Sequence, residues 1–200
     1  MVTNFEDLDP AGTYTFADYL TWQFKERVEI IKGKLFKMAM PTEKHQRLSS
    51  NVHRIFANYL YRKPCRVYHP PFDVRLEKPP HQRKPKDKSI FTVIQPDITV
   101  VCDLTKVDDK GCFGAPDLVI EILSPSTGSK DLKEKKKVYE FAEVPEYWII
   151  HPLDETVAVY ILNDQKKYVI DNIYASIDTI KSHVFKDLDV DLKDVFEIYD

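Results

Sequence analysis

Glycine is scarce in this chain, with five residues among 200, against 13 prolines. So few glycines argue against long flexible linkers between separate domains. The length is enough for one sizeable hydrophobic core and short for two. We therefore expect a single domain over residues 14–200, preceded by a flexible tail over residues 1–13.

Cysteine is scarcer still, and its three positions are unequally spaced: Cys65, Cys102 and Cys112. No C-x-x-C pair is present, so the sequence supports neither a zinc knuckle nor a disulfide framework. We expect reduced thiols, as in a cytoplasmic protein. The chain also lacks a run of about 18 apolar residues, and its acidic N-terminus lacks the apolar stretch of a signal peptide. We therefore expect a cytoplasmic protein with no membrane partner.

An excess of positive charge is also missing, because the formal net charge is −3. This balance excludes nonspecific binding of nucleic acid by a uniformly basic surface, but it does not exclude a local basic site. Such a site is suggested by the proline-rich loop from Lys78 to Lys88, which could contact a DNA backbone. A solvated loop explains its charges equally well. Trp22 and Trp148 are expected in a core or an interface, and no aromatic ladder for stacking bases is apparent.

Residues 15–24 form a short helix candidate after the N-cap Thr15, and short apolar segments alternate with two longer helix-like segments along the rest of the chain. Residues 42–62 carry an apolar stripe at helical spacing after the capping residue Thr42, and residues 131–144 form a second helix candidate. Lys32-Gly33 separates two apolar runs and predicts a hairpin. Strands are expected in the following segments: 65–69, 72–77, 92–103, 117–124, 146–151, 156–162 and 167–174. This order predicts an α/β (mixed α+β) fold with a mixed central sheet flanked by helices.

Two of the expected strands carry carboxylates within apolar surroundings. Alternation of side chains places Asp117 and Glu121 on one face of the segment "DLVIEIL" and apolar residues on the other. In "QPDITVVCD", the same alternation places Asp97 on the face opposite Ile98 and Val100. If the two strands are neighbours, their apolar faces align and Asp97 and Glu121 converge on the other side.

The helices place two further polar side chains on apolar stripes. Lys135 lies in the middle of the inward face of residues 131–144, so a buried anion is its expected partner. His45 lies about 20° from Val52 on the helical wheel, one turn from the start of the longer helix. Each has a structural alternative: Lys135 could extend to water or pair with Asp131, and His45 could be a core residue with satisfied hydrogen bonds.

Two carboxylates and a cation are the groups needed for metal-assisted hydrolysis of a phosphodiester. Carboxylates bind Mg²⁺ through hard oxygen ligands, and a lysine can stabilise developing negative charge. Asp117 could be a third ligand, or it could simply accept hydrogen bonds from loop amides at the start of its strand. A metal centre built on Cys and His is not supported, because these residues show no ligand spacing.

Six segments, in this order and at this spacing, resemble the Uma2 (DUF820) family, described as restriction endonucleases: "VEIIKGKLFKM", "PTEKHQRLSSNV", "VIQPDITVVCD", "GAPDLVIEILSPST", "DLKEKKKVYEFAEVPEYWIIHP" and "TVAVYIL". The resemblance covers residues 14–196. It implies a restriction-endonuclease-like PD-(D/E)XK core and a Mg²⁺-dependent endonuclease, with Mn²⁺ as a substitute. It also implies nucleic acid, DNA in particular, as the partner, and a homodimer.

By that resemblance Asp97 and Glu121 take the motif's two carboxylate positions, and Asp117 matches a family position as either a third metal ligand or a group that supports the ligands. The motif's lysine is missing, because position 123 is Leu; Lys135 falls where similar sequences place a lysine on the next helix. His45 matches a family position in the first helix. The alternative is a catalytically silent protein of the same fold that serves as a nucleic-acid-binding or assembly module.

Overall fold

A six-stranded mixed sheet forms the centre of the computed structural model, which describes residues 2–77, 86–124 and 128–198, without the side chains of 128–132. Across the sheet the strands follow the order β12 (Tyr168–Ala175), β11 (Thr156–Leu162), β10 (Glu146–His151), β9 (Leu118–Ile122), β6 (Ile98–Val101) and β3 (Arg66–Tyr68). Only the β9–β10 pair is parallel; the other neighbours are antiparallel. This sheet carries the strands on which Asp97 and Glu121 were expected to converge.

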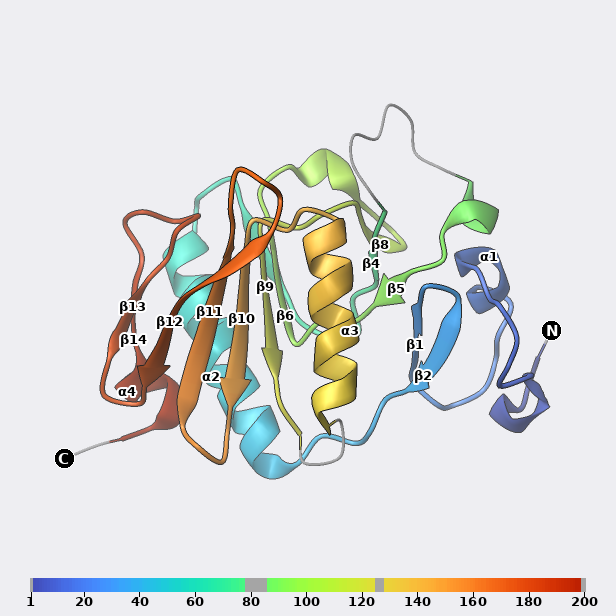
Figure 1. Cartoon of the computed structure of the whole chain (residues 1–200), viewed down its shortest axis with the longest axis horizontal. Coiled ribbons are helices and arrows are strands. Elements are labelled where there is room, and N and C mark those ends of the chain that lie inside the picture. The colour runs from blue at the N-terminus through green and yellow to red at the C-terminus, as the bar shows by residue number, and fades with distance from the viewer. Residues whose placement is uncertain (1, 78–85, 125–127, 199–200) are drawn as a thin grey trace.

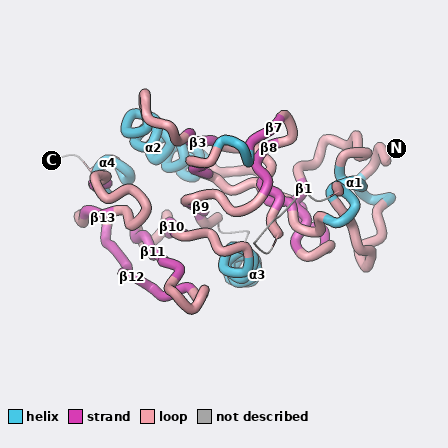
Figure 2. The backbone as a smooth tube through the Cα atoms, turned by 90° about the horizontal axis from the view of Figure 1, so that it is seen from above, coloured by secondary structure: helices cyan, strands magenta, loops and turns pink. Residues whose placement is uncertain are grey.

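Two helices cover opposite faces of this sheet (Figures 1 and 2). The first, α2 (Glu43–Leu60), begins at Thr42, whose hydroxyl accepts a hydrogen bond from the His45 amide. Its apolar stripe packs on Ile98, Val100 and the inward residues of β9. On the other face, α3 (Gly128–Phe141) packs Val138 and Tyr139 against the sheet, and Ala142 just after the helix joins them. The mixed sheet between helices confirms the predicted fold class.

A second six-stranded sheet adjoins the first on the N-terminal side of the molecule. Its strands follow the order β2 (Lys34–Lys37), β1 (Val28–Ile31), β5 (Val93–Ile94), β4 (Val74–Arg75), β8 (Gly111–Phe113) and β7 (Val107–Asp108). The β1–β2 hairpin turns at Lys32 and Gly33, which both have positive φ values (51° and 80°). The predicted hairpin is therefore confirmed, and its turn needs the left-handed conformation that glycine adopts readily.

The remaining elements are short. They are the 3₁₀ helices η1 (Phe5–Asp7), η2 (Asp87–Ser89) and η3 (Leu104–Lys106), the helices α1 (Phe16–Tyr19) and α4 (Leu192–Phe196), and the strands β13 (Thr179–Lys181) and β14 (Asp189–Asp191). The β13–β14 hairpin and α4 contribute the buried residues Ile180, Val190 and Leu192 to the core between α2 and the central sheet. No helix in the described part of the chain has both the length and the apolar character needed to cross a membrane.

The segment 92–103, expected as one strand, is two strands that belong to different sheets. β5 ends at Ile94 and β6 begins at Ile98. Pro96 lies between them and lacks the amide hydrogen that a continuing ladder requires. The chain thus crosses from one sheet to the other at Gln95, Pro96 and Asp97, and this crossing brings Asp97 to the junction of the two sheets.

The N-terminal residues, expected to be a loose tail, make defined contacts. Val2 forms a parallel bridge with Trp22, and the Phe5 ring meets the Phe24 ring edge-on at 5.7 Å. Leu8 is buried. The helix expected from Thr15 onward is also shorter than its sequence suggested. It ends at Tyr19, although Thr15 and Asp18 form the capping box at its start.

Two of the cysteines correct the expectation of reduced thiols. Cys65 and Cys102 are joined by a disulfide, whereas Cys112 is free and buried. The reason is the pairing of β3 with β6, which places Arg66 opposite Val101 and therefore the two flanking cysteines side by side. A separation of 37 residues does not reveal this pairing, because only the sheet register brings the two positions together.

Candidate active site

The pairing of β6 with β9 aligns the two carboxylate-bearing strands as predicted. The strands are antiparallel, with Ile98 opposite Ile120 and Thr99 opposite Val119. Their apolar faces, including Ile98 and Ile120, are buried under α2. The same register places Asp97 opposite Glu121, and both side chains lie on the other face of the sheet. The structure therefore brings both side chains to one wall of a common cavity.

Asp97 is held by contacts from two elements. Its Oδ2 accepts a hydrogen bond of 2.8 Å from the backbone amide of Ile122, the residue after Glu121. The same oxygen lies 3.3 Å from Nε2 of His45 in the first turn of α2. Burial alone would lower the pKa of His45, but the hydrogen bond to Asp97 and its negative charge outweigh burial and raise it. His45 Nδ1 is buried and has no hydrogen-bond partner among the described residues.

Lys135 reaches Glu121 from the inward face of α3, as its place on the helical wheel predicts. Its Nζ lies 3.0 Å from Glu121 Oε1 and 3.2 Å from Oε2. It also lies 3.0 Å from Oε1 of Glu29 on β1. Burial alone would lower the pKa of Lys135, but the charges of Glu121 and Glu29 outweigh it, so this pKa is raised and the ammonium stays charged.

Glu121 is the most constrained of the acidic groups. Its Oε1 also accepts a hydrogen bond of 2.5 Å from the Tyr139 hydroxyl, one turn after Lys135. Burial raises the pKa of Glu121 to about 7; the charge of Lys135 opposes this rise, and the charges of Asp97 and Glu29 add to it. The cluster thus holds three carboxylates around one ammonium, which leaves excess negative charge in a partly enclosed space.

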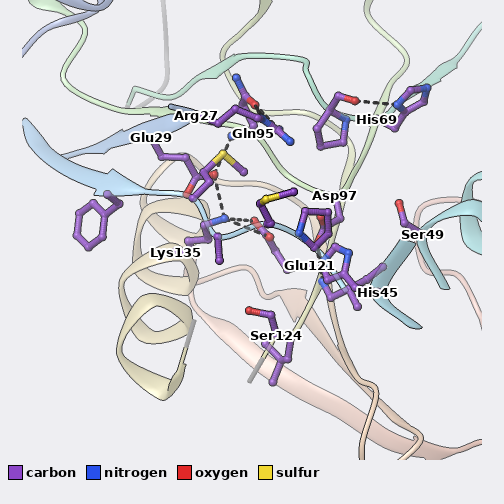
Figure 3. Close-up of a pocket in the computed structure, with 18 of the residues that line it drawn as sticks. Arg27, Glu29, His45, Ser49, His69, Gln95, Asp97, Glu121, Ser124 and Lys135 are labelled. Atoms are coloured by element: carbon purple, nitrogen blue, oxygen red, sulfur yellow. Dashed lines mark hydrogen bonds and ion pairs between the residues drawn. The ribbon is translucent and has the colours of Figure 1, made fainter. Parts of the chain in front are cut away.

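These groups face a cavity of about 170 Å³ between the two sheets and the N-terminus of α2 (Figure 3). Its lining is charged where Glu29, Asp97, Glu121 and Lys135 contribute. Apolar side chains, among them Ile31, Phe36 and Met38, also line it. A polar group bound in this cavity would therefore meet carboxylates and an ammonium beside apolar side chains.

Gln95 connects this cluster to a second set of polar groups. Its backbone amide donates to Glu29 Oε1 at 2.9 Å, and its side-chain oxygen accepts two hydrogen bonds from Arg27, at 3.2 and 2.5 Å. The side-chain nitrogen Nε2 of Gln95 donates a hydrogen bond to Asp73 Oδ1 at 2.8 Å and lies 3.2 Å from the Tyr19 hydroxyl. The position of Arg27 at the rim of the cavity is therefore fixed by the crossing segment between the sheets.

Asp117 lies apart from the other predicted site residues. Its Oδ2 accepts a hydrogen bond of 2.7 Å from the Cys102 backbone amide, at the far end of β6. Four residues of strand separate it from Glu121, about 13 Å at the usual rise. It does not line the cavity. Its geometry matches the alternative in which this carboxylate accepts hydrogen bonds from loop amides.

Comparison with known proteins identifies relatives of this chain. The family model Uma2, described as "Putative restriction endonuclease", matches residues 16–193. The chain belongs to the Uma2 family. An uncharacterized protein of Synechocystis sp., slr1290, is 24% identical over 162 residues, which is 80% of each chain.

A solved structure shows the same fold. It is that of a "putative nuclease belonging to DUF820" from Anabaena variabilis, which superposes with a TM-score of 0.69 at 20% sequence identity. The match covers 92% of this chain and 98% of that one. The predicted endonuclease-like fold is therefore confirmed for this Uma2 protein, which belongs to a family of nucleases by description.

Several residues of the Uma2 cavity were missed by sequence reasoning. Glu29, Gln95 and Arg27 all contribute polar atoms to the cluster. Glu29 had a usable signal, because it is the one acidic residue in the apolar run "VEII", as Glu121 is in "LVIEI". Gln95 and Arg27 had none, since their contact depends on how the two sheets meet.

The predicted basic loop cannot be placed, because residues 78–85 lie outside the described part of the chain. Arg75, which precedes it, is 1% exposed, and its Nη2 lies 2.6 Å from Asp108 Oδ1. It therefore belongs to the interior of the second sheet. The cations near the cavity come instead from Arg27, Lys37 and Lys135.

The donor set suits a hard divalent cation. Glu29, Asp97 and Glu121 offer carboxylate oxygens, the ligands that Mg²⁺ and Mn²⁺ prefer. Among the described residues, no three His, Cys, Asp or Glu side chains are already arranged as a metal site. Mg²⁺ does not require such a cage, because proteins usually bind it through one or two carboxylates, with water and substrate oxygens completing the shell. Asp97 and Glu121 fit that requirement.

Proposed function

We propose that this Uma2 protein is a Mg²⁺-dependent endonuclease that hydrolyses phosphodiester bonds of DNA. The observation that carries the proposal is the contact of Lys135 Nζ with Glu121, in a cavity that Asp97 also lines. Two carboxylates and one cation on separate elements converge there, and the family description "Putative restriction endonuclease" supports the same reaction class. Mn²⁺ is the expected substitute because it takes the same oxygen ligands.

Each side chain has a distinct part in this proposal. Asp97 and Glu121 would hold the cation, which when bound lowers the pKa of a coordinated water and neutralises phosphate charge. Glu29 and Glu121 keep the Lys135 ammonium fixed at the cavity wall, where it can donate to a phosphate oxygen as negative charge develops. His45 orients Asp97 through Nε2. Asp117 accepts a hydrogen bond from the backbone amide of Cys102 and is not assigned a role in the reaction.

We propose DNA as the substrate and a homodimer as the assembly. DNA is favoured over other phosphodiesters because the family is described as restriction endonucleases. Cutting both strands of a duplex would need two such sites, so we propose a homodimer. Sedimentation velocity of the purified chain, with and without a duplex, measures whether one or two copies are present; a single copy under both conditions contradicts the homodimer.

A cleavage assay tests the proposed function. Purified protein is incubated with supercoiled plasmid, single-stranded DNA and RNA, each with Mg²⁺, with Mn²⁺ or with EDTA. We expect cleavage of DNA with either metal and none with EDTA. Cleavage that persists in EDTA would contradict the metal-dependent mechanism. Binding without turnover on any substrate would favour the silent nucleic-acid-binding module instead.

A further inference from the structure

A second cavity of about 400 Å³ adjoins the candidate active site on the N-terminal side of the molecule. The two cavities share Arg27 and Gln95 in their walls. Since Gln95 Oε1 accepts two hydrogen bonds from Arg27, a rigid polar pair separates them. The two cavities are therefore neighbours on either side of the Arg27–Gln95 pair.

Aromatic rings form one wall of this second cavity. Trp22 and Phe24 are stacked with their ring centroids 5.5 Å apart and their planes 26° apart. The Tyr19 ring meets Trp22 edge-on at 5.6 Å. The sequence concealed this grouping, because the turn after α1 brings the three rings together. The side chain of Trp22 is half-buried, so part of it remains accessible.

Two cations follow these aromatic residues directly along the chain. Lys25 and Arg27 are exposed and also line the cavity. Glu26 brings a negative charge to the same wall, but its carboxylate lies 3.6 Å from Lys37 Nζ and is partly neutralised. Aromatic rings beside cations are the combination by which proteins bind single-stranded nucleic acid, with bases stacked on the rings and phosphates near the cations.

We propose that this aromatic cavity is a subsite for an unpaired nucleobase of the substrate strand, next to the scissile phosphate. Trp22 and Phe24 would stack with the base, and Lys25 and Arg27 would lie along the adjoining phosphates. The inference rests on the proposed nuclease function and adds the substrate class, a strand that is single-stranded beside the cut. Bases within a duplex are already stacked and cannot occupy such a cavity without unpairing.

The fluorescence of Trp22 tests this subsite directly. A single-stranded oligothymidylate of about 12 nucleotides, long enough to cross both cavities, is added in EDTA so that binding is measured without cleavage. The chain has two tryptophans, and Trp148 is 1% exposed in the core. We therefore expect quenching in the wild-type protein that is absent in Trp22→Phe, which keeps an aromatic ring at that position.

Affinity provides the second readout, by fluorescence anisotropy of the labelled oligonucleotide. We expect Trp22→Ala to weaken binding about tenfold. Lys25→Gln should lower the slope of log affinity against log salt by about 0.7. Tyr61→Ala is the matched control, because Tyr61 is 71% exposed and has the Arg62 guanidinium 5.2 Å from its ring. Circular dichroism shows whether each variant is folded.

The outcomes distinguish failure of the proposed subsite from failure of the proposed nuclease function. Equal affinities of Trp22→Ala and Tyr61→Ala, or unchanged quenching in Trp22→Phe, would overturn the subsite. If cleavage still depends on metal, the proposed function then stands alone. Loss of quenching and of affinity as predicted, together with no cleavage on any substrate, would support the subsite and refute the nuclease. If Trp22→Ala is unfolded, the Trp22→Phe and Lys25→Gln readouts decide.

Discussion

Lys135 shows how a single residue can be placed from the sequence while its full set of partners cannot. Its position on the inward face of α3 follows from helical spacing alone, and the missing lysine at position 123 directs attention to it. One partner, Glu121, was expected because it lies on the preceding strand. The other, Glu29, lies 106 residues away on β1 of the second sheet. Long-range contacts of this kind depend on sheet packing, which no local pattern encodes.

Replacement of Lys135 by Met tests the role of its charge. The change keeps the aliphatic stem but leaves Glu29 and Glu121 buried without their cation, so we expect the free energy of unfolding to fall by about 3–5 kcal/mol. Where the protein remains folded, cleavage should fall about a hundredfold or more, because a donor to the phosphate is lost. Chemical denaturation and the plasmid assay measure the two effects.

The matched control is Lys137, two residues along the same helix. Its side chain is 62% exposed and forms an ion pair with Glu134 in the i,i+3 relation. Surface changes of this kind alter stability by about 0.5 kcal/mol or less, so Lys137→Met should leave both readouts near the wild-type values. An equal loss of activity in the two variants would contradict the assigned role of Lys135.

Among the elements, the crossing segment between β5 and β6 shapes the site most. Sequence periodicity predicted one strand there, because both halves are apolar and of strand type. Pro96 breaks that strand, and the break lets Gln95 join the second sheet to Asp97 at the edge of the first. The prediction placed Asp97 on the correct face but could not show that two sheets meet at it.

Gly111 in β8 lies against the backbone of Asp73, next to this junction. Its φ is +102°, and a Cβ added there would lie 2.1 Å from the backbone oxygen of Asp73. Asp73 in turn holds the Gln95 side chain. We expect Gly111→Ala to destabilise the protein by at least about 1–3 kcal/mol through strain alone and to loosen Arg27. Urea unfolding measures this, and an unchanged transition midpoint would show that β8 does not support the junction.

At the scale of the whole molecule, the central sheet, its two long helices and the β1–β2 hairpin were predictable, and the assembly of the second sheet was not. β10, β11 and most of β12 lie where alternation placed them, and α2 begins at the predicted cap. The second sheet is assembled from strands of two to four residues, too short to show a period. The Cys65–Cys102 disulfide depends on the register of β3 and β6, and the aromatic cavity depends on the turn after α1, so both became visible only in three dimensions.

The most direct test of the central claim compares two carboxylates of one short segment. Glu121 lines the cavity with Lys135, whereas Asp117 accepts a hydrogen bond from the Cys102 amide outside it. Plasmid cleavage with Mg²⁺ or Mn²⁺ is measured for the wild type, Glu121→Gln, Asp97→Ala and Asp117→Asn. We predict that the first two variants lose cleavage and that Asp117→Asn keeps it. Cleavage at the wild-type rate by Glu121→Gln or Asp97→Ala would contradict the claim.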